Sequence, residues 1–116
     1  MTNDSPDKLY IAVRGDLPPG LQMAQAVHSM AQFSKEHSSV FERWHFSSNY
    51  LVIVAVPDED ALLDLITEAS RRGLRRSATR EPDLDNQATA VAIEPGPETS
   101  RLCASLPLAL KERAVA

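Results

Sequence analysis

Apolar and polar positions along this chain follow two different periods, and the change from one to the other marks the elements. Residues 8–14 and 50–56 are short runs rich in β-branched and aromatic side chains, a composition typical of strands. The second run is apolar at both odd and even positions, which predicts a central strand buried on both faces. Weaker strand patterns follow at 74–80 and 87–94.

Helical periodicity separates these strands. Residues 21–37 carry apolar side chains at steps of three and four, and we expect the following four to form the core face of a helix: Met23, Val27, Met30 and Ala31. Residues 40–44 predict a second, short helix. Residues 57–72 begin with acids and end with arginines, which suits the helix dipole. Residues 98–106 predict a last helix.

The order of these elements predicts the fold class α/β, as a single domain with a four-stranded mixed sheet and helices on both faces. Helical crossovers favour parallel pairing of the first three strands, and the short link from residue 80 to residue 87 permits an antiparallel neighbour. A chain of 116 residues suffices for one core. We expect this domain to span residues 8–110, with flexible ends at 1–7 and 111–116.

The composition narrows the class of protein. Hydrophobic residues make up 43% and charged residues 24%, as in globular proteins, and the net charge of −4 argues against a surface coated in basic residues. The single cysteine, Cys103, cannot form an internal disulfide, and no Cys/His set has zinc spacing, so we expect a cytoplasmic protein without metal or cofactor. No run approaches the about 20 apolar residues of a membrane span.

Five motifs then occur in a characteristic order: Arg14-Gly15-Asp16-Leu17, Gly20-x-x-x-Ala24-Gln25-Ala26-x-His28, Arg43-Trp44, Pro57-Asp58-Glu59-x-x-Leu62, and Ala88-Thr89-Ala90-Val91-Ala92-Ile93-x-Pro95-Gly96-Pro97. Together they resemble the second type of peptidyl-tRNA hydrolase, especially the short, divergent branch of peptidyl-tRNA hydrolase domain-containing proteins. The resemblance implies a homodimer that hydrolyses the ester between a stalled peptide and the terminal ribose of tRNA. That reaction needs an oriented water, donors for an oxyanion, and cations or helix starts for phosphate.

The resemblance also implies catalytic residues. Thr89 matches a threonine whose hydroxyl donates to a carbonyl oxygen or holds water, although threonine is also a common strand residue. The catalytic aspartate of the family lies on the preceding loop, where Asp85 is favoured and Asp83 is the alternative; both also fit a solvated acidic turn. His28 could orient a water, although a lone helix histidine is more often structural.

Substrate-binding residues follow in the same way. Asp16 and Gln25 match the family motifs, and Asp16 fits an Asx turn equally well. The helix that begins at Gly20 places free N–H groups at the carboxyl end of a strand, where anions bind. A basic cluster is a candidate for tRNA phosphates or simply for the helix dipole: Arg71, Arg72, Arg75, Arg76 and Arg80. The aromatic residues Phe33, Phe41 and Trp44, like Cys103, are expected in the core.

One position departs from the family pattern. Leu21 stands where the family has a lysine, and a leucine side chain supplies neither charge nor a hydrogen-bond donor. The leading hypothesis is hydrolysis of peptidyl-tRNA or a related acylated RNA. The alternative is a catalytically weak or inactive member that binds RNA or protein. Hydrolysis of another ester or amide is a third possibility, because fold does not fix substrate.

Overall fold

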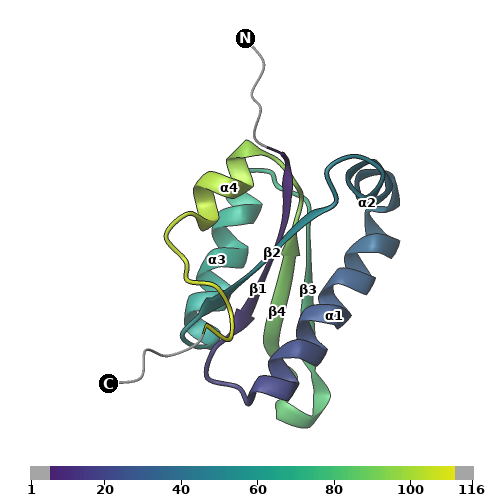
Figure 1. Ribbon diagram of the computed structural model, residues 1–116. Helices are drawn as coiled ribbons and strands as arrows, with labels where there is room; N and C mark the ends of the chain where they lie inside the picture. The colour runs from purple at the N-terminus through teal and green to yellow at the C-terminus, as the bar shows by residue number, and fades with distance from the viewer. Residues whose placement is uncertain (1–5, 112–116) are drawn as a thin grey trace.

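The computed structural model describes residues 6–111 and contains a four-stranded mixed sheet between two layers of helices (Figure 1). The strands are β1 (Lys8–Arg14), β2 (Tyr50–Val56), β3 (Arg76–Glu81) and β4 (Gln87–Ile93), and they lie in the order β2-β1-β4-β3. β1 is parallel to β2, and β4 is antiparallel to both of its neighbours. The predicted fold class is confirmed.

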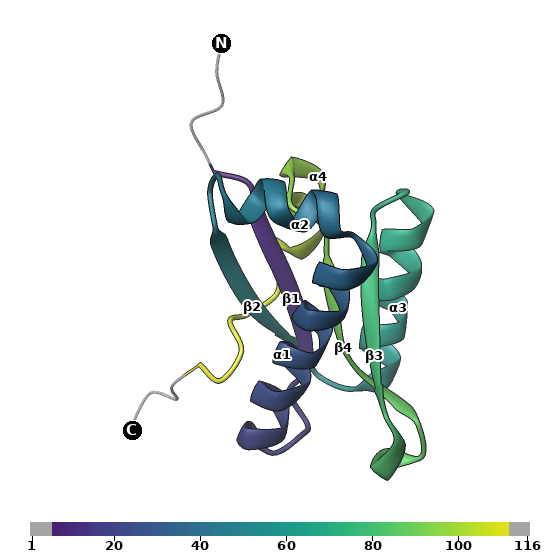
Figure 2. The same ribbon diagram turned by 90° about the vertical axis from the view of Figure 1, so that its right-hand side faces the viewer.

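Two helices cover each face of the sheet. α1 (Pro19–Glu36) and α2 (Ser38–His45) lie on one side, with α1 crossing in front of β1 and β4 in Figure 2; α3 (Glu59–Arg71) and α4 (Pro97–Cys103) lie on the other. Asp58 caps α3 by accepting a hydrogen bond from the backbone N–H of Ala61 at 2.9 Å. None of the helices within residues 6–111 has the length and apolar character needed to cross a membrane.

Each face of the sheet has its own apolar core. Phe33 and Trp44 are buried on the α1 side with Phe41 packed against them, and Cys103 is buried on the α3 side, so these four predictions are confirmed. Burial raises the pKa of the Cys103 thiol to about 11, because desolvation disfavours the thiolate. The thiol therefore stays protonated and inert at neutral pH.

The prediction that residues 50–56 form a central strand is wrong. β2 is an edge strand, with Tyr50 49% and Leu51 39% exposed. Two 2.9 Å backbone hydrogen bonds join Ile53 and Ala55 to residues 107–109, here called the C-terminal strap. The strap covers part of the free edge, and only one face of β2 is fully covered by helices.

The predicted pairing of the third strand is also wrong. β3 runs in the same direction as β1 and β2, as its crossover requires, but it pairs with β4 alone. The connection through α3 carries the chain past β1 and β4 to the opposite edge of the sheet. A helical crossover fixes the direction of a strand and leaves its neighbour open.

The expected core face of α1 is correct only for Met30, which is half-buried and packs against the core. Met23 is 61% exposed and Val27 67% exposed, and Ala31 is also exposed. The side chains that α1 buries are Gln22, Gln25, Ala26, Ser29 and Phe33. Helical spacing shows which residues share a face but not which face packs on the sheet, and the polar face can be buried when its groups find partners.

Candidate functional site

A β-bulge in β4 builds the centre of the candidate site. Opposite the step from Thr79 to Arg80, β4 has one extra residue, Thr89, where the pairing register shifts. Bulges redirect side chains locally, and this one turns Thr89 toward α1. There the Thr89 hydroxyl donates a 2.6 Å hydrogen bond to Oε1 of Gln25.

The hydrogen bonds continue from Gln25 to a carboxylate. Gln25 Nε2 donates to Glu81 Oε2 at 2.8 Å, and the backbone N–H of Asp83 donates to Glu81 Oε1 at 3.2 Å. Thr89 is 0% and Gln25 1% exposed, whereas Glu81 is half-buried. In this Thr89–Gln25–Glu81 chain, Glu81 is therefore the member that solvent or a ligand reaches.

A buried arginine fixes the strand ends beside this chain. Arg14 is 7% exposed, and its Nε and Nη2 atoms donate to the two carboxylate oxygens of Asp16 at 3.0 and 2.8 Å. Its Nη1 atom donates to Gln87 Oε1 at 2.8 Å and to the Ala88 carbonyl at 3.2 Å. Asp16 therefore positions Arg14, and Arg14 links the end of β1 to the start of β4.

We expect the Arg14–Asp16 pair to make stability depend on pH. The hydrogen bond from Arg14 lowers the pKa of Asp16 below its ordinary value of 3.8. A lowered pKa in the folded state adds stability above the unfolded value, and this contribution is lost as pH falls through the folded value. It amounts to less than about 1 kcal/mol, because 38% of the Asp16 side chain is exposed.

Urea unfolding of wild type and Asp16→Asn across pH 7 to 2 checks this expectation. The difference in free energy of unfolding between the two proteins should be largest near neutral pH and shrink below about pH 4. A difference that stays constant over the whole range would contradict it.

The structure brings only some of the predicted catalytic residues together. Thr89 meets Gln25, as described above. Asp85 is exposed in the β3–β4 turn with a φ of +52°, Asp83 joins the site through its backbone alone, and His28 is exposed on α1. Within residues 6–111 no hydrogen bond reaches the side chains of Asp85 or His28.

The start of α1 offers backbone donors at the same end of the sheet. Gln22 is the first residue of the helix whose N–H is bonded, to the Pro18 carbonyl at 3.0 Å. The N–H groups of Gly20 and Leu21 have no acceptor among the described residues. No other atom lies within 4 Å of where a Cβ on Gly20 would stand, so open space adjoins these donors. Leu21 lies one turn before Gln25 on the same helix face.

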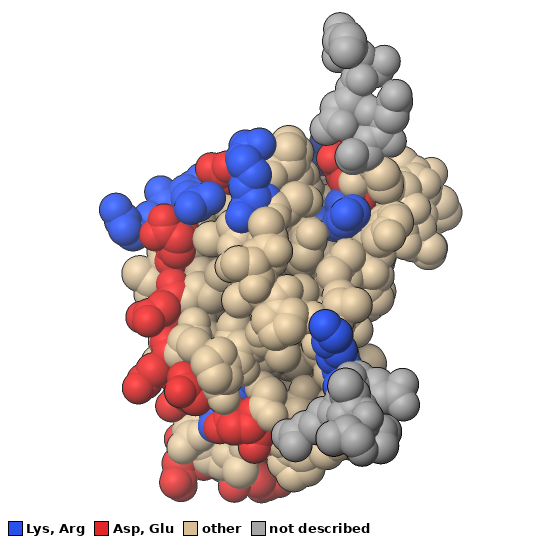
Figure 3. Space-filling view, turned by 60° about the vertical axis from the view of Figure 1, so that its left-hand side comes forward, with Lys and Arg blue, Asp and Glu red and all other residues tan. Residues whose placement is uncertain are grey.

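Charge divides the two ends of the sheet. The loops, the start of α3 and the end of β3 place seven acidic residues at the site end: Asp16, Asp58, Glu59, Asp60, Glu81, Asp83 and Asp85. The three predicted substrate-binding arginines lie between the end of α3 and the start of β3, at the opposite end of the sheet. Figure 3 shows basic side chains gathered at the top of the molecule. Arg71 and Arg72 pair with Glu68, and Arg75 pairs with Glu94. The structure therefore separates them from Glu81 by the length of β3.

Glu81 is the residue that sequence reasoning missed. The strand was expected to end at Arg80, which left the acidic turn to supply the carboxylate. The available signal was a glutamate between the β-pattern and Pro82, at the place where a strand ends and a turn begins.

Comparisons with known proteins agree with the motifs. The model of the family described as Peptidyl-tRNA hydrolase PTH2 matches residues 7–105. The chain is 30% identical over 100 residues to mitochondrial peptidyl-tRNA hydrolase 2 of Bos taurus and 32% identical over 98 residues to that of Mus musculus. These matches cover 78% and 79% of this chain but 56% and 51% of the relatives, so the chain spans about half the length of the curated relatives it matches.

A solved structure shares the fold. It is that of a protein of unknown function from Agrobacterium tumefaciens, with a TM-score of 0.64 over 90% of this chain and 98% of the other. The sequence identity is 12%, so the likeness concerns the fold alone.

Proposed function

Because this chain belongs to the peptidyl-tRNA hydrolase 2 family, we propose that it hydrolyses the ester joining a peptide to the terminal ribose of tRNA. The observation that carries this proposal is the Thr89–Gln25–Glu81 chain, which holds a reachable carboxylate at the same end of the sheet as the free N–H groups that start α1. A base and oxyanion donors at one place are what ester hydrolysis requires.

In the proposed reaction Glu81 accepts a proton from a water molecule as the water oxygen attacks the ester carbonyl carbon. The N–H groups of Gly20 and Leu21 donate to the negative charge that develops on the carbonyl oxygen. The carbon–oxygen bond to the ribose then breaks, and the ribose oxygen takes the proton from Glu81. The products are tRNA with its hydroxyl restored and a peptide carboxylic acid, which releases its proton to water and leaves as the carboxylate.

Gln25 and Thr89 act as positioning residues in this scheme. Thr89 donates to the amide oxygen of Gln25, which turns the Gln25 amide nitrogen toward Glu81. Both side chains are buried, so they orient the carboxylate without touching substrate. Glu81 takes the role that the sequence suggested for Asp85 or Asp83.

Release of free tRNA from an N-acylated aminoacyl-tRNA by the purified protein tests the proposal. Thr89→Val should lower kcat about tenfold by freeing Gln25, a loss of about 1.4 kcal/mol. Thr79→Val is the matched control, because the Thr79 hydroxyl is buried without a partner among the described residues. A wild-type protein that binds tRNA tightly without cleaving it would instead support the alternative of a non-catalytic RNA-binding module.

We propose that the arginines at the far end of the sheet contact tRNA phosphates. Their ion pairs are solvent-exposed and individually weak, so phosphate groups can compete for the guanidinium groups. The seven acids at the site end disfavour phosphate there, which supports contact by Arg71, Arg72 and Arg75 instead. The acylated terminus of the tRNA would then reach Glu81 separately.

We also propose a homodimer in the cytoplasm. Phe46 is 83% and Tyr50 49% exposed, and two exposed aromatic side chains four residues apart support association. Sedimentation at micromolar concentration should give twice the chain mass, and a purely monomeric species would count against the homodimer.

The lone thiol, Cys103, supports the reducing cytoplasm as the compartment, which cell fractionation checks.

A further inference from the structure

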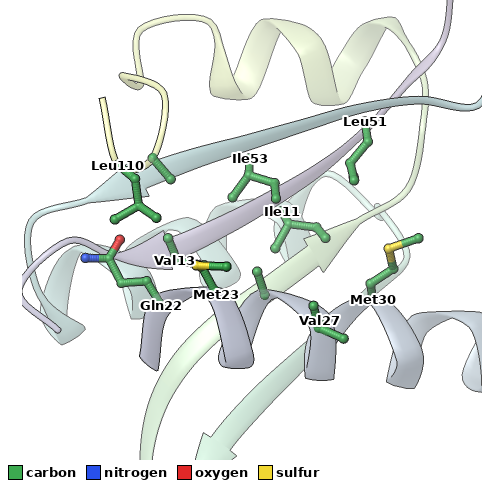
Figure 4. Close-up of a pocket in the computed structure, with 11 residues that line it drawn as sticks. Ile11, Val13, Gln22, Met23, Val27, Met30, Leu51, Ile53 and Leu110 are labelled. Carbon is green, nitrogen blue, oxygen red and sulfur yellow. The ribbon is translucent and has the colours of Figure 1, made fainter. Parts of the chain in front are cut away.

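An open, almost entirely apolar groove of about 250 Å³ lies between α1 and the β1–β2 side of the sheet (Figure 4). Met23, Val27 and Met30 of α1 line one wall, and Leu51 and Ile53 of β2 line the other. The groove lies on the side of α1 away from β3, so it is distinct from the Thr89–Gln25–Glu81 chain.

Both walls expose apolar side chains to water, which is unfavourable for the free protein. α1 exposes Met23 and Val27 while it buries Gln22 and Gln25. β2 leaves Leu51 39% exposed. Two elements far apart in the sequence thus present apolar side chains to one space. Such a paired surface is typical of a ligand site rather than of scattered exposed residues.

One polar atom in the groove lacks a partner. Gln22 is 5% exposed, and its Nε2 atom donates to the Leu17 carbonyl at 2.7 Å. Its Oε1 atom is buried and has no hydrogen-bond partner within the part of the chain that the structure describes. In Figure 4 this oxygen points into the groove beside Leu110. A buried acceptor without a donor is unfavourable, so a ligand N–H group that reached this oxygen as Leu110 moved aside would gain a hydrogen bond.

The polar end of the groove adjoins the proposed reaction site. Gln22 lies three residues before Gln25 on α1, a rise of about 4.5 Å. From Gln22 to Met30 the helix rises about 12 Å, which is the length of three to four extended residues. A chain attached to an ester at Glu81 could therefore pass the start of α1 and enter the groove.

We propose that this groove binds the peptide part of the substrate, an inference that rests on the proposed function. The peptide is uncharged and apolar over the three or four residues nearest the ester, and one of its backbone N–H groups donates to Gln22 Oε1. A charged peptide side chain would lose its water here without gaining a partner, because no charged residue lines the groove. RNA is unsuited to it for the same reason.

Binding of free peptides tests the groove independently of catalysis. An N-acetylated, C-amidated Leu-Val-Leu peptide, titrated into ¹⁵N-labelled protein, should shift the amide signals of Val27 and Leu51. A peptide with Asp at the central position should bind about tenfold more weakly. Val27→Asp should weaken Leu-Val-Leu binding about tenfold, whereas Ala31→Asp, on an exposed position outside the groove, should leave it unchanged. Met23→Glu is a second groove variant, and circular dichroism checks that each variant is folded.

The outcomes separate the groove from the proposed function. Hydrolysis by wild type with no peptide-induced shifts at the groove would overturn this inference and leave the function standing. Groove binding without any hydrolysis would support the groove and remove the function. A Val27→Asp protein that changes from dimer to monomer would show that a second copy covers the groove, which would also overturn the inference.

Discussion

Glu81→Gln should lower the release of tRNA from peptidyl-tRNA by a factor of roughly 100 to 10,000. Glutamine keeps the shape of the side chain and can still accept the hydrogen bond from Gln25, but its amide cannot take a proton from water. The loss should therefore fall on kcat, with tRNA affinity and unfolding free energy near wild type. Single-turnover cleavage of a labelled N-acylated aminoacyl-tRNA measures it.

Asp85→Asn and Asp83→Asn are the matched controls for Glu81→Gln. Each removes one negative charge from the same exposed turn, and asparagine tolerates the φ of +52° that Asp85 adopts. Both variants should retain activity close to wild type. If Asp85→Asn were inert and Glu81→Gln active, the catalytic role would return to the aspartate that the sequence favoured.

Leu21→Lys should raise the rate of cleavage roughly tenfold to a hundredfold, or by about 1 to 3 kcal/mol. Leu21 is half-buried on the same face of α1 as Gln25, which donates a hydrogen bond to Glu81. A lysine stem can replace the leucine against the protein while its ammonium group approaches the developing negative charge. The increase should appear in kcat and should be lost in the double variant with Glu81→Gln.

Ala24→Lys separates this local effect from general attraction of RNA. It adds the same charge to an exposed position of α1 that lies outside the groove. It should lower KM without raising kcat, and this effect should fade with salt. Equal gains in kcat from Leu21→Lys and Ala24→Lys would contradict a specific role for position 21.

Local signals in the sequence were sufficient for the elements and their order. Asp58 before an amphipathic run predicts the start of α3, because its side chain bonds the N–H of Ala61 within the same turn. The β-branched run at 50–56 predicts β2 for a similarly local reason. Family motifs placed Thr89 and Gln25 in one site, and they meet.

These local signals do not predict which strands and side chains pair when they lie far apart in the sequence. The same apolar pattern fits a central strand and an edge strand beside an apolar groove, which is why β2 was misplaced. The period of α1 could not tell whether Met23 or Gln25 faces the sheet, because that choice depends on partners for Gln25. Those partners are Thr89 and Glu81, which lie 64 and 56 residues further along the chain.

For the same reason the sequence does not indicate Glu81 as the carboxylate of the candidate site. Glu81 joins the site through Gln25, which also accepts from the hydroxyl of Thr89, the extra residue of the β4 bulge. A bulge has no reliable local signature in a run of alanines and valines such as this one. Spacing from a family motif therefore points to the acidic turn, a few residues too far along the chain.

The C-terminal strap affects how the protein behaves at high concentration. It occupies the backbone groups of Ile53 and Ala55, on the outer edge of a strand that is apolar along its whole length. Without residues 107–109 that edge would be a template on which the β2 strand of another molecule could add, the first step toward a growing fibril. We therefore expect the strap, whose Ala109 also lines the groove, to disfavour polymerisation of concentrated protein.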